Sequence, residues 1–423
     1  MASAREPNDE DVCARMRQRA KRWMFDGFRM LSGNGHAKLA LVFATVVLLP
    51  ECVRAQTKKA VEDKASNSAA QRQEAGTIVT LLRNGHILLI NALDGKALSE
   101  YTSQTSAVTP AFGGPFITLG RTGTTLFVLV QHGGNESAEV VAIDVASLTF
   151  RKFARAPGGV QYGSISVGAR TDRIFLGSAT SDRIVAINGN GEKTPQVWET
   201  HLDRSFDWLA YRGVVSADEQ RFYFSYHGGL SRNVLTGEEG APTGGVDWFD
   251  IHGDVAKRCG EPTRARNGCL GGHGRFELLA TGLLVATGSK MVLDIDMDGR
   301  SRRSYDTMRE EHLMDFATDA ERHLLFAVGT CINGGGFTAT ALARDDMRTG
   351  AAPAARTGKP GSVSSSDAEV CGDRIVAGKS KEWVAVARAG QSGGEILVVD
   401  ARTGSRRRTI ATSSGVADLY VLP

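Results

Sequence analysis

The sequence predicts an all-β protein, a seven-bladed β-propeller built from four-stranded antiparallel blades. The main observation is a repeated motif in which an aliphatic strand ends in Asp or Asn and a tight polar turn follows. Copies begin at Leu88, Val140, Ile184, Val292 and Ile396. When the longer gaps are divided among intervening blades, the copies lie roughly 45 to 55 residues apart, a period typical of propeller repeats. In addition, the chain after Gln73 contains no convincing amphipathic helical pattern.

Groups of three or four strand-length segments, rich in β-branched residues and separated by Gly, Asn, Asp and Ser, define the blades. Four such segments are found in blades 2, 3, 5 and 7, which start at Pro115, Ser164, Phe276 and Arg374. Blades 4 and 6 are less regular. Blade 4 contains a Gly-rich insertion, so its third strand is predicted either at Leu230–Leu235 or at Val246–Ile251, and the second position is favoured.

The two ends of the chain predict how the ring closes. The first blade has three predicted strands, Thr77–Arg83, His86–Asn91 and Ala97–Tyr101, whereas Val416–Leu422 is left over after blade 7 is complete. A propeller closes by removing its free sheet edges, and a terminal strand commonly completes the first blade. We therefore expect Val416–Leu422 to be the innermost strand of blade 1, which gives seven blades in total.

Turn geometry explains the Asp or Asn of the repeated motif. Its short side chain accepts hydrogen bonds from the amides of the following turn, and the Gly that often follows tolerates a positive φ. The motif resembles the YVTN-type repeats of the quinoprotein amine dehydrogenase-like propeller superfamily, and its best match here runs from Val399 through Asp400 and Thr403 to Gly404. This resemblance implies the scaffold and no single activity, because that superfamily includes enzyme subunits, lactonase-like enzymes, surface-layer modules and proteins that only bind.

Residues 1–55 are predicted to be a secretory signal peptide with an extended N-terminus. A basic segment precedes the apolar run Leu39–Leu49, and the side chains of Val53 and Ala55 suit cleavage after Ala55. The run is too short to cross about 30 Å of hydrocarbon as a helix, and a membrane anchor or a buried helix is the alternative.

The leader sets the predicted domain boundaries and compartment. A start at Met24 or Met30 would give the leader a more ordinary length. Residues 56–75 are predicted to be a flexible polar lead-in, and residues 76–423 to form the propeller. The mature protein is therefore expected to be periplasmic or secreted and to lack a membrane span.

Export changes how the cysteines are interpreted. The chain has six cysteines, and two of them leave with the leader, so that Cys259, Cys269, Cys331 and Cys371 remain. An even number in an oxidising compartment favours disulfides over metal ligation. Cys259 and Cys269 bracket a short Arg-rich insertion, whereas Cys331 and Cys371 fall on one face of adjacent predicted blades. We therefore predict the pairs Cys259–Cys269 and Cys331–Cys371.

Composition and absent motifs argue against several classes of function. The net charge of +3 is close to neutral and gives no reason to expect a nucleic acid partner. The chain after the leader lacks CxxC, CxxCH and His-Glu-x-x-His motifs, so no cofactor is predicted. Asp294, Asp296 and Asp298 match the start of a calcium loop, but Tyr305 stands where the last acidic ligand belongs, and an ordinary acidic turn is favoured.

The candidate site residues lie at one predicted face. If the strands of a blade are labelled a to d from the axis outward, the b–c loops and the loops from strand d to the next strand a share one face, here called the b–c face. His132 and His227 each precede Gly-Gly in a predicted b–c loop, where glycine permits close approach of a ligand. The blade-to-blade loops of the same face add Arg204, Asp207, His273, Glu311 and His312.

These seven residues predict a binding site around the mouth of the propeller. The favoured function is therefore an exported module that binds a protein or an extracellular small molecule through the b–c face. The first alternative is an enzyme, a lactonase-like or metal-assisted hydrolase that uses His132, His227 and His312. The second alternative is a cofactor-free subunit of a dehydrogenase complex.

Overall fold

The computed structural model describes residues 76–103, 114–131, 138–159, 161–178, 183–188, 196–199, 209–227, 245–251, 276–278, 282–287, 291–296, 301–307, 313–319, 323–329, 331, 336–342, 363–364, 370–378, 382–390 and 393–422. The chain divides into two compact units, Met1–Glu74 and Ala75–Pro423, and all described residues belong to the second. The predicted leader and lead-in lie outside these residues. Within them, no helix is long and apolar enough to cross a membrane.

The described strands form seven antiparallel sheets, six with four strands and one with three. Sheet 1 contains β27 (Val416–Val421), β1 (Thr77–Leu82), β2 (Ile87–Asn91) and β3 (Ala97–Tyr101) in that order. Sheet 2 contains β4 (Ile117–Leu119), β5 (Thr125–Val130), β6 (Glu139–Asp144) and β7 (Phe150–Arg155). Sheet 3 contains β8 (Tyr162–Val167), β9 (Ile174–Ser178), β10 (Arg183–Ile187) and β11 (Gln196–Glu199).

The remaining sheets follow in chain order. Sheet 4 contains β12 (Leu209–Val215), β13 (Arg221–His227) and β14 (Gly245–Asp250). Sheet 5 contains β15 (Phe276–Leu278), β16 (Gly282–Thr287), β17 (Met291–Asp296) and β18 (Ser301–Asp306). Sheet 6 contains β19 (Leu313–Asp319), β20 (Leu324–Gly329), β21 (Phe337–Ala341) and β22 (Val363–Ser364). Sheet 7 contains β23 (Arg374–Ala377), β24 (Trp383–Ala389), β25 (Gly394–Asp400) and β26 (Arg406–Thr412).

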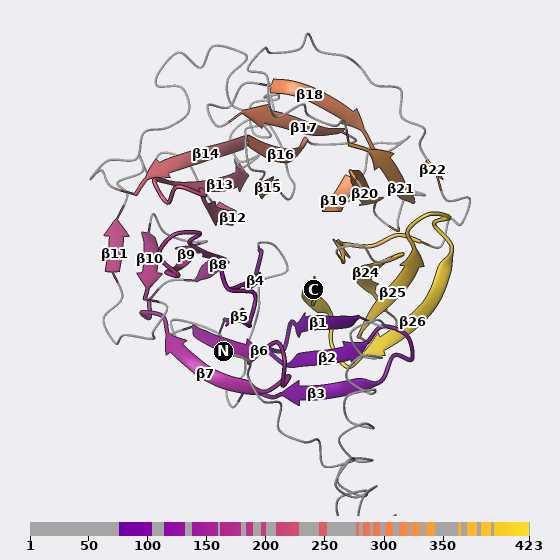
Figure 1. Ribbon diagram of the computed structural model, residues 1–423, viewed down its shortest axis with the longest axis horizontal. Helices are drawn as coiled ribbons and strands as arrows, with labels where there is room; N and C mark the ends of the chain where they lie inside the picture. The colour runs from indigo at the N-terminus through magenta and orange to yellow at the C-terminus, as the bar shows by residue number, and fades with distance from the viewer. Residues whose placement is uncertain are drawn as a thin grey trace, which may run out of the picture. The chain divides into compact units, whose positions relative to one another are not determined.

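The sheets surround a common centre, and the inner strands β4, β8, β12, β15 and β19 lie nearest to it (Figure 1). Inner strands of successive sheets contact one another, as β27 does with β4, β4 with β8, and β8 with β12. The same holds for β19 with β23 and for β23 with β27. The predicted all-β class and β-propeller architecture are therefore confirmed.

Two details differ from the predicted pattern of uniform four-stranded blades. Sheet 4 has three strands among the described residues, and β22 of sheet 6 is only two residues long. The third strand of sheet 4 is β14, at the favoured position, while the other candidate, Leu230–Leu235, lies outside the described residues.

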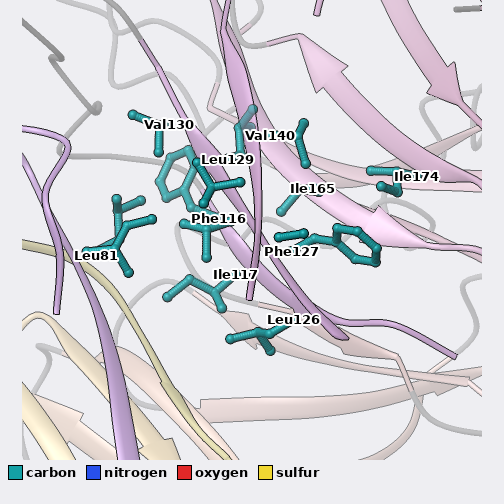
Figure 2. Packing of buried hydrophobic residues seen from close by; sticks show 14 of the residues in the cluster. Leu81, Phe116, Ile117, Leu126, Phe127, Leu129, Val130, Val140, Ile165 and Ile174 are labelled. Atoms are coloured by element: carbon teal, nitrogen blue, oxygen red, sulfur yellow. The ribbon is translucent and has the colours of Figure 1, made fainter. Parts of the chain in front are cut away.

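The core lies between neighbouring sheets, which explains why the second strands of sheets 1 and 2 are buried along nearly their whole length. Strand β1 is buried at every residue, and β5 at all but its first. Leu81 of β1, Ile117 of β4, Leu129 of β5 and Ile165 of β8 belong to one buried cluster (Figure 2). β-branched and aromatic side chains suit strands that are covered on both faces.

Closure by the C-terminal strand occurs as predicted. Strand β27 pairs antiparallel with β1, with Ile78 opposite Val421 and Thr80 opposite Leu419. The amide of Arg83 also donates to the carbonyl of Gly415 at 2.8 Å. The first and last segments of the propeller thus share one sheet.

The structural explanation of the repeated Asp or Asn is also confirmed where side chains are described. The side-chain oxygens of Asn91, Asp144 and Asp400 accept hydrogen bonds from the turn amides of Leu93, Ser147 and Thr403, respectively, at 2.7–2.8 Å. Burial alone would raise the pKa of Asp400, but its hydrogen bonds with Arg407 and the turn amides hold that pKa well below its ordinary value.

Removal of residues 416–423 is expected to unfold the propeller or to lower its melting temperature strongly. The deletion takes away Val416, Leu419, Val421 and Leu422, all at most 8% exposed. Burial of each such side chain is worth about 1.5–3 kcal/mol, so the total is comparable with the whole stability of a domain. Thermal denaturation followed by circular dichroism measures the effect, and deletion of Pro423 alone is the control. An unchanged melting curve for the longer deletion would contradict closure by β27.

Candidate binding site on the b–c face

Most of the predicted binding residues lie outside the part of the chain that the structure describes. These are His132, Arg204, Asp207, His273, Glu311 and His312. The seventh, His227, is the last residue of β13, and its backbone pairs with that of Leu209. The gathering of all seven at the mouth of the propeller therefore stays a prediction.

A disulfide crosses the b–c face between sheets 6 and 7. Cys331 follows β20 and Cys371 precedes β23, and their Cα atoms lie 5.0 Å apart across a sequence separation of 40 residues. This is the predicted pair, whereas Cys259 and Cys269 lie outside the described residues. Cys371 is buried and Cys331 is exposed. The b–c loop of one sheet is thus covalently joined to the segment that enters the next.

The backbone around the disulfide is packed closely. The amide of Gly372 donates to the carbonyl of Gly329 at 3.0 Å and so links the same two segments. A Cβ atom at Gly372 would lie 2.3 Å from the carbonyl oxygen of Ala387, so only glycine fits this approach. The disulfide and this close packing therefore restrict the movement of the two segments relative to each other.

Buried carboxylates lie on the inner strands. Asp418 of β27 is 5% exposed, and its Oδ2 accepts hydrogen bonds from the amides of Phe116 at 2.6 Å and Ile117 at 3.2 Å. Asp315 of β19 is fully buried and accepts from the amide of Ile375 at 3.0 Å. A buried carboxylate is tolerated when such hydrogen bonds replace its hydration. Each acid therefore joins the inner strand of its own sheet to that of the next.

Sequence analysis missed these two acids, although a signal was present. Each stands third in an inner strand that is otherwise mostly apolar, in Leu313-Met314-Asp315-Phe316 and in Val416-Ala417-Asp418-Leu419. A lone acid inside such a strand indicates a polar role in the interior.

Further polar side chains under the b–c face also join neighbouring sheets. Arg374 of β23 is 8% exposed, and its Nε donates to the carbonyl of Ala417 in β27 at 3.1 Å. Gln131, which follows β5, accepts from the amide of Tyr162 in β8 at 3.0 Å. These hydrogen bonds link neighbouring sheets directly beneath the b–c face.

The b–c loop of sheet 1 carries an arginine, Arg83, and a histidine, His86. His86 Nδ1 lies 3.2 Å from Glu100 Oε1 of β3, and the His86 amide donates to Asn84 Oδ1 at 3.3 Å. Arg83 is exposed beside Gly415 of the neighbouring loop. The described part of the face thus offers a cation, an imidazole and a carboxylate to solvent or to a partner.

The opposite face carries the a–b loops and the c–d turns. Several charged side chains of its a–b loops join neighbouring sheets. Arg121 and Asp172 join sheets 2 and 3 by an ion pair at 2.7 Å. Glu219 accepts from the amides of Arg170 and Thr171 at 2.6 and 2.7 Å, and so joins sheets 3 and 4. Burial by itself would raise the pKa of Glu219, but these hydrogen bonds and those of Thr171 Oγ1 lower it below its ordinary value.

The described residues give little support to a catalytic centre. No group of three His, Cys, Asp or Glu side chains within them could hold a metal ion. Asp294 is 3% exposed on β17, and Asp298 lies outside the described part. The b–c loop of sheet 7 contains Gly390-Gln391-Ser392-Gly393-Gly394, a Gly-x-Ser-x-Gly pattern that sequence analysis overlooked. It joins the antiparallel strands β24 and β25, whereas a nucleophile elbow requires a strand followed by a helix.

No protein-family model matches the chain, and no curated protein matches its sequence. Among solved structures, a putative 6-phosphogluconolactonase from Bacteroides uniformis has a TM-score of 0.54 at 9% identity, covering 82% of this chain and 99% of that one. The periplasmic gluconolactonase PpgL of Pseudomonas aeruginosa has a TM-score of 0.51 at 13% identity, covering 82% and 99%. The dihydro-heme d1 dehydrogenase NirN has a TM-score of 0.49 at 10% identity, covering 82% and 75%.

At such identities the similarity is one of fold alone. The chain is a β-propeller. The comparisons transfer no substrate, cofactor or partner to it, and they leave the YVTN-type superfamily unconfirmed.

Replacement of Asp418 by Ala is expected to lower the free energy of unfolding by about 3 kcal/mol or more, because each buried amide left without an acceptor costs about 1–3 kcal/mol. The amides concerned are those of Phe116, Ile117 and Leu419. Asp418→Asn should fall between Ala and wild type, because the amide group keeps one acceptor oxygen. Urea denaturation measures all three proteins.

The matched control for Asp418 is Glu382→Ala, because the Glu382 side chain is 82% exposed. Its effect should stay within about 0.5 kcal/mol, as is usual for surface positions. Equal stability of the Asp418 and Glu382 variants would show that the contact between sheets 1 and 2 does not depend on Asp418.

The double replacement Cys331→Ser and Cys371→Ser is expected to lower the free energy of unfolding by about 2–4 kcal/mol, because the unfolded chain loses a cross-link. Reduction of the wild-type protein should lower the free energy of unfolding by at least as much, because it also opens the predicted Cys259–Cys269 pair. Peptide mapping without reduction should recover Cys331 linked to Cys371 and Cys259 linked to Cys269. Free thiols at these positions, or crossed pairs, would contradict the predicted connectivity.

Proposed function

We propose that this protein is exported and that its propeller binds a protein or an extracellular small molecule through the b–c face. The observation that carries this proposal is the Cys331–Cys371 disulfide, which fixes the b–c rim between sheets 6 and 7. A rim that is rigid before binding reduces the entropy lost on association. A cross-link at this position therefore suits a preformed binding surface.

The proposed compartment is the periplasm or the extracellular space. A disulfide suits an oxidising compartment, and residues 1–55 have the order of basic, apolar and small residues found in signal peptides. We accordingly assign residues 1–55 to a cleaved leader, 56–75 to a lead-in and 76–423 to the propeller.

We choose the b–c face because the polar side chains of the two faces differ in what they contact. On the a–b face, Arg121, Asp172 and Glu219 are engaged between sheets. On the b–c face, the sequence supplies the seven predicted binding residues, and the described loop of sheet 1 adds Arg83 and His86. We propose that these groups together form the binding site.

We also infer that the seven sheets are seven blades of one closed ring of the YVTN-type, quinoprotein amine dehydrogenase-like kind. Support comes from the pairing of β27 with β1 and from the contacts between successive inner strands. The Asp-capped turn at Asp400, which carries the YVTN-like sequence, adds to it.

The two alternatives have weaker support. A lactonase-like or metal-assisted hydrolase would need His132, His227 and His312 to converge, and the fold similarity to two lactonases does not supply this. A subunit of a dehydrogenase complex would need a partner that carries the cofactor, and no observation favours it.

Site-specific photo-crosslinking in the producing cells tests the proposed face. A photoreactive amino acid is placed at His132, His227 or His312 on the b–c face, and at His323 or Glu382 in a–b loops as matched controls. Adducts are expected from the b–c positions and not from the controls. Adducts confined to the controls, or an unprocessed leader in the recovered protein, would contradict the proposal.

Metal analysis and a lactone hydrolysis assay on the same mature protein separate the binding module from the hydrolase. The binding module predicts no stoichiometric metal and no hydrolysis. Stoichiometric metal together with hydrolysis that is lost on replacement of His132, His227 and His312 by Ala would establish the enzyme instead.

A further inference from the structure

The outermost strands of sheets 7 and 2 are both exposed and basic. Strand β26 (RRRTIAT) begins with three consecutive arginines, and β7 (FRKFAR) also contains three bases. Neither strand contains an acid. All six bases are exposed residues, namely Arg151, Lys152, Arg155, Arg406, Arg407 and Arg408.

One base of each strand is paired with acids of its own sheet. Lys152 Nζ lies 3.4 Å from Glu139 Oε1 of β6. Arg407 forms an ion pair with Asp400 of β25 and lies 3.8 Å from Glu382. The side chains of Glu139 and Asp400 are only 6% and 16% exposed, so these two acids lie beneath the bases and contribute little negative charge at the surface.

Two other bases contact neutral groups. The guanidinium of Arg151 lies over the ring of Phe153, 5.0 Å from its centroid. Arg408 Nη1 donates to the backbone carbonyl of Asp94 at 2.9 Å. Because a guanidinium has five N–H donors, both arginines keep donors for a ligand. The two strands thus carry more positive charge than their pairing within the sheets requires.

Strand β3 of sheet 1 joins the two basic strands into one surface. Strands β26, β3 and β7 follow one another along the outer rim of the ring (Figure 1). A Cβ atom at Gly95, in the turn before β3, would lie 3.5 Å from Arg408 Cδ of β26. At its other end, β3 contacts β7 through Tyr101 and Phe150, whose ring centroids lie 5.7 Å apart. We call the exposed surface of β26, β3 and β7 the outer band.

Sheet 1 adds little negative charge to the outer band. Strand β3 (ALSEY) has one acid, Glu100, whose side chain is 51% exposed and lies 3.2 Å from His86. Lys96, which directly precedes β3, is 81% exposed and lies 3.7 Å from Asp94. The three strands together therefore carry six bases and one acid.

We propose that the outer band binds an anionic polysaccharide, a flexible chain of sugar units that carry carboxylates. Guanidinium groups match carboxylates in charge and in their forked geometry. The three strands belong to successive sheets of a ring and so face different directions, which a flexible chain can follow and a flat bilayer cannot. The choice of a polysaccharide rests on the export proposed above, because such polymers occur outside the cytoplasm.

Affinity measurements with the mature protein test the proposal. The probe is a fluorescently labelled polygalacturonate fragment, and the control probe is the same fragment with its carboxylates methyl-esterified. Binding of the charged fragment should weaken as salt is raised, because pairing with a polyanion releases counterions. The esterified fragment should bind about tenfold more weakly, since it forms no ion pairs. Equal binding of the two fragments would overturn the proposal.

Single replacements locate the contact. Arg151→Gln in β7 and Arg408→Gln in β26 should each weaken binding of the charged fragment about two- to fivefold, the range expected for one exposed ion pair. Glu100→Gln should strengthen binding by a similar factor, because it removes the acid from the path of the polymer. Arg151→Lys keeps the charge and should retain the wild-type affinity. Arg155→Gln replaces either arginine variant if its melting temperature falls.

The matched control is Arg170→Gln, which makes the same change in net charge at an exposed residue in the a–b loop of sheet 3. Its affinity for the charged fragment should equal that of wild type. If Arg170→Gln weakens binding as much as Arg151→Gln and Arg408→Gln do, the effect is one of net charge and the proposal is wrong.

Two further probes examine other partners for the same surface. Vesicles of phosphatidylglycerol present anionic headgroups on a flat surface, and single-stranded DNA is a flexible polymer of phosphates. The mature protein should bind both more weakly than it binds the charged fragment. Tighter binding of either one would assign the outer band to that partner and overturn the polysaccharide.

A variant of the b–c face separates this inference from the proposed function. The triple replacement of His132, His227 and His312 by Ala should bind the charged fragment like wild type. Loss of binding in that variant would place the fragment on the b–c face and overturn the outer band. Normal binding of the fragment without any crosslinks from the b–c positions would contradict the proposed function alone.

Discussion

The antiparallel pairing of β27 with β1 is the constraint on which the rest of the propeller depends. It places residues from the two ends of the propeller unit in one sheet, with Ile78 opposite Val421. Such a pairing closes the ring of sheets, because it completes sheet 1 with a strand from the other end of the propeller. Once β27 occupies the innermost position of sheet 1, it contacts β23 on one side and β4 on the other. The position of Asp418, and so its hydrogen bonds with sheet 2, follows from this closure.

Apolar burial holds neighbouring sheets together, and a few buried polar groups fix how they meet. Apolar contacts carry little directional information, whereas a hydrogen bond from a carboxylate to one particular amide does. Asp418, Asp315 and Ser166 each accept a hydrogen bond from the inner strand of the next sheet. Because Asp418 and Asp315 lie near the start of their strands, at the b–c end, they also support the proposed binding face from beneath.

Sequence predicted the parts of the structure that are determined locally. The strands follow from runs of β-branched residues, and the c–d turns follow from the hydrogen bonds of Asn91, Asp144 and Asp400 with amides two or three residues ahead. The closing strand was predictable because one strand was missing at one end and one was left over at the other. The pairing of Cys331 with Cys371 followed from their positions on one face of neighbouring sheets.

Contacts between distant residues were harder to predict. Asp418 and Phe116 are 302 residues apart in the sequence, and no local pattern indicates that they meet. The binding residues present the same difficulty, because His132 and His312 can form one site only through the geometry of the whole ring. Leu148 has a φ of 57° in the turn where sheets 1 and 7 have Gly95 and Gly404, so the repeated motif predicted this turn without the glycine that such a φ favours.

The outermost strands of sheets 2 and 7 carry basic residues that form ion pairs with acids of the third strands, Lys152 with Glu139 and Arg407 with Asp400. Strand β7 has the burial pattern ieeiie and β26 has eeeeBeB, so apolar burial alone specifies the register of these strands weakly. In sheets 1, 2, 5 and 7 the register between the third and fourth strands also shifts by a local irregularity. In sheets 2 and 7 an ion pair between the third and fourth strands can select one register, since a slip moves the base away from its acid. Ion pairs therefore help to fix the pairing of the exposed outermost strands in sheets 2 and 7, where hydrophobic packing specifies the register weakly.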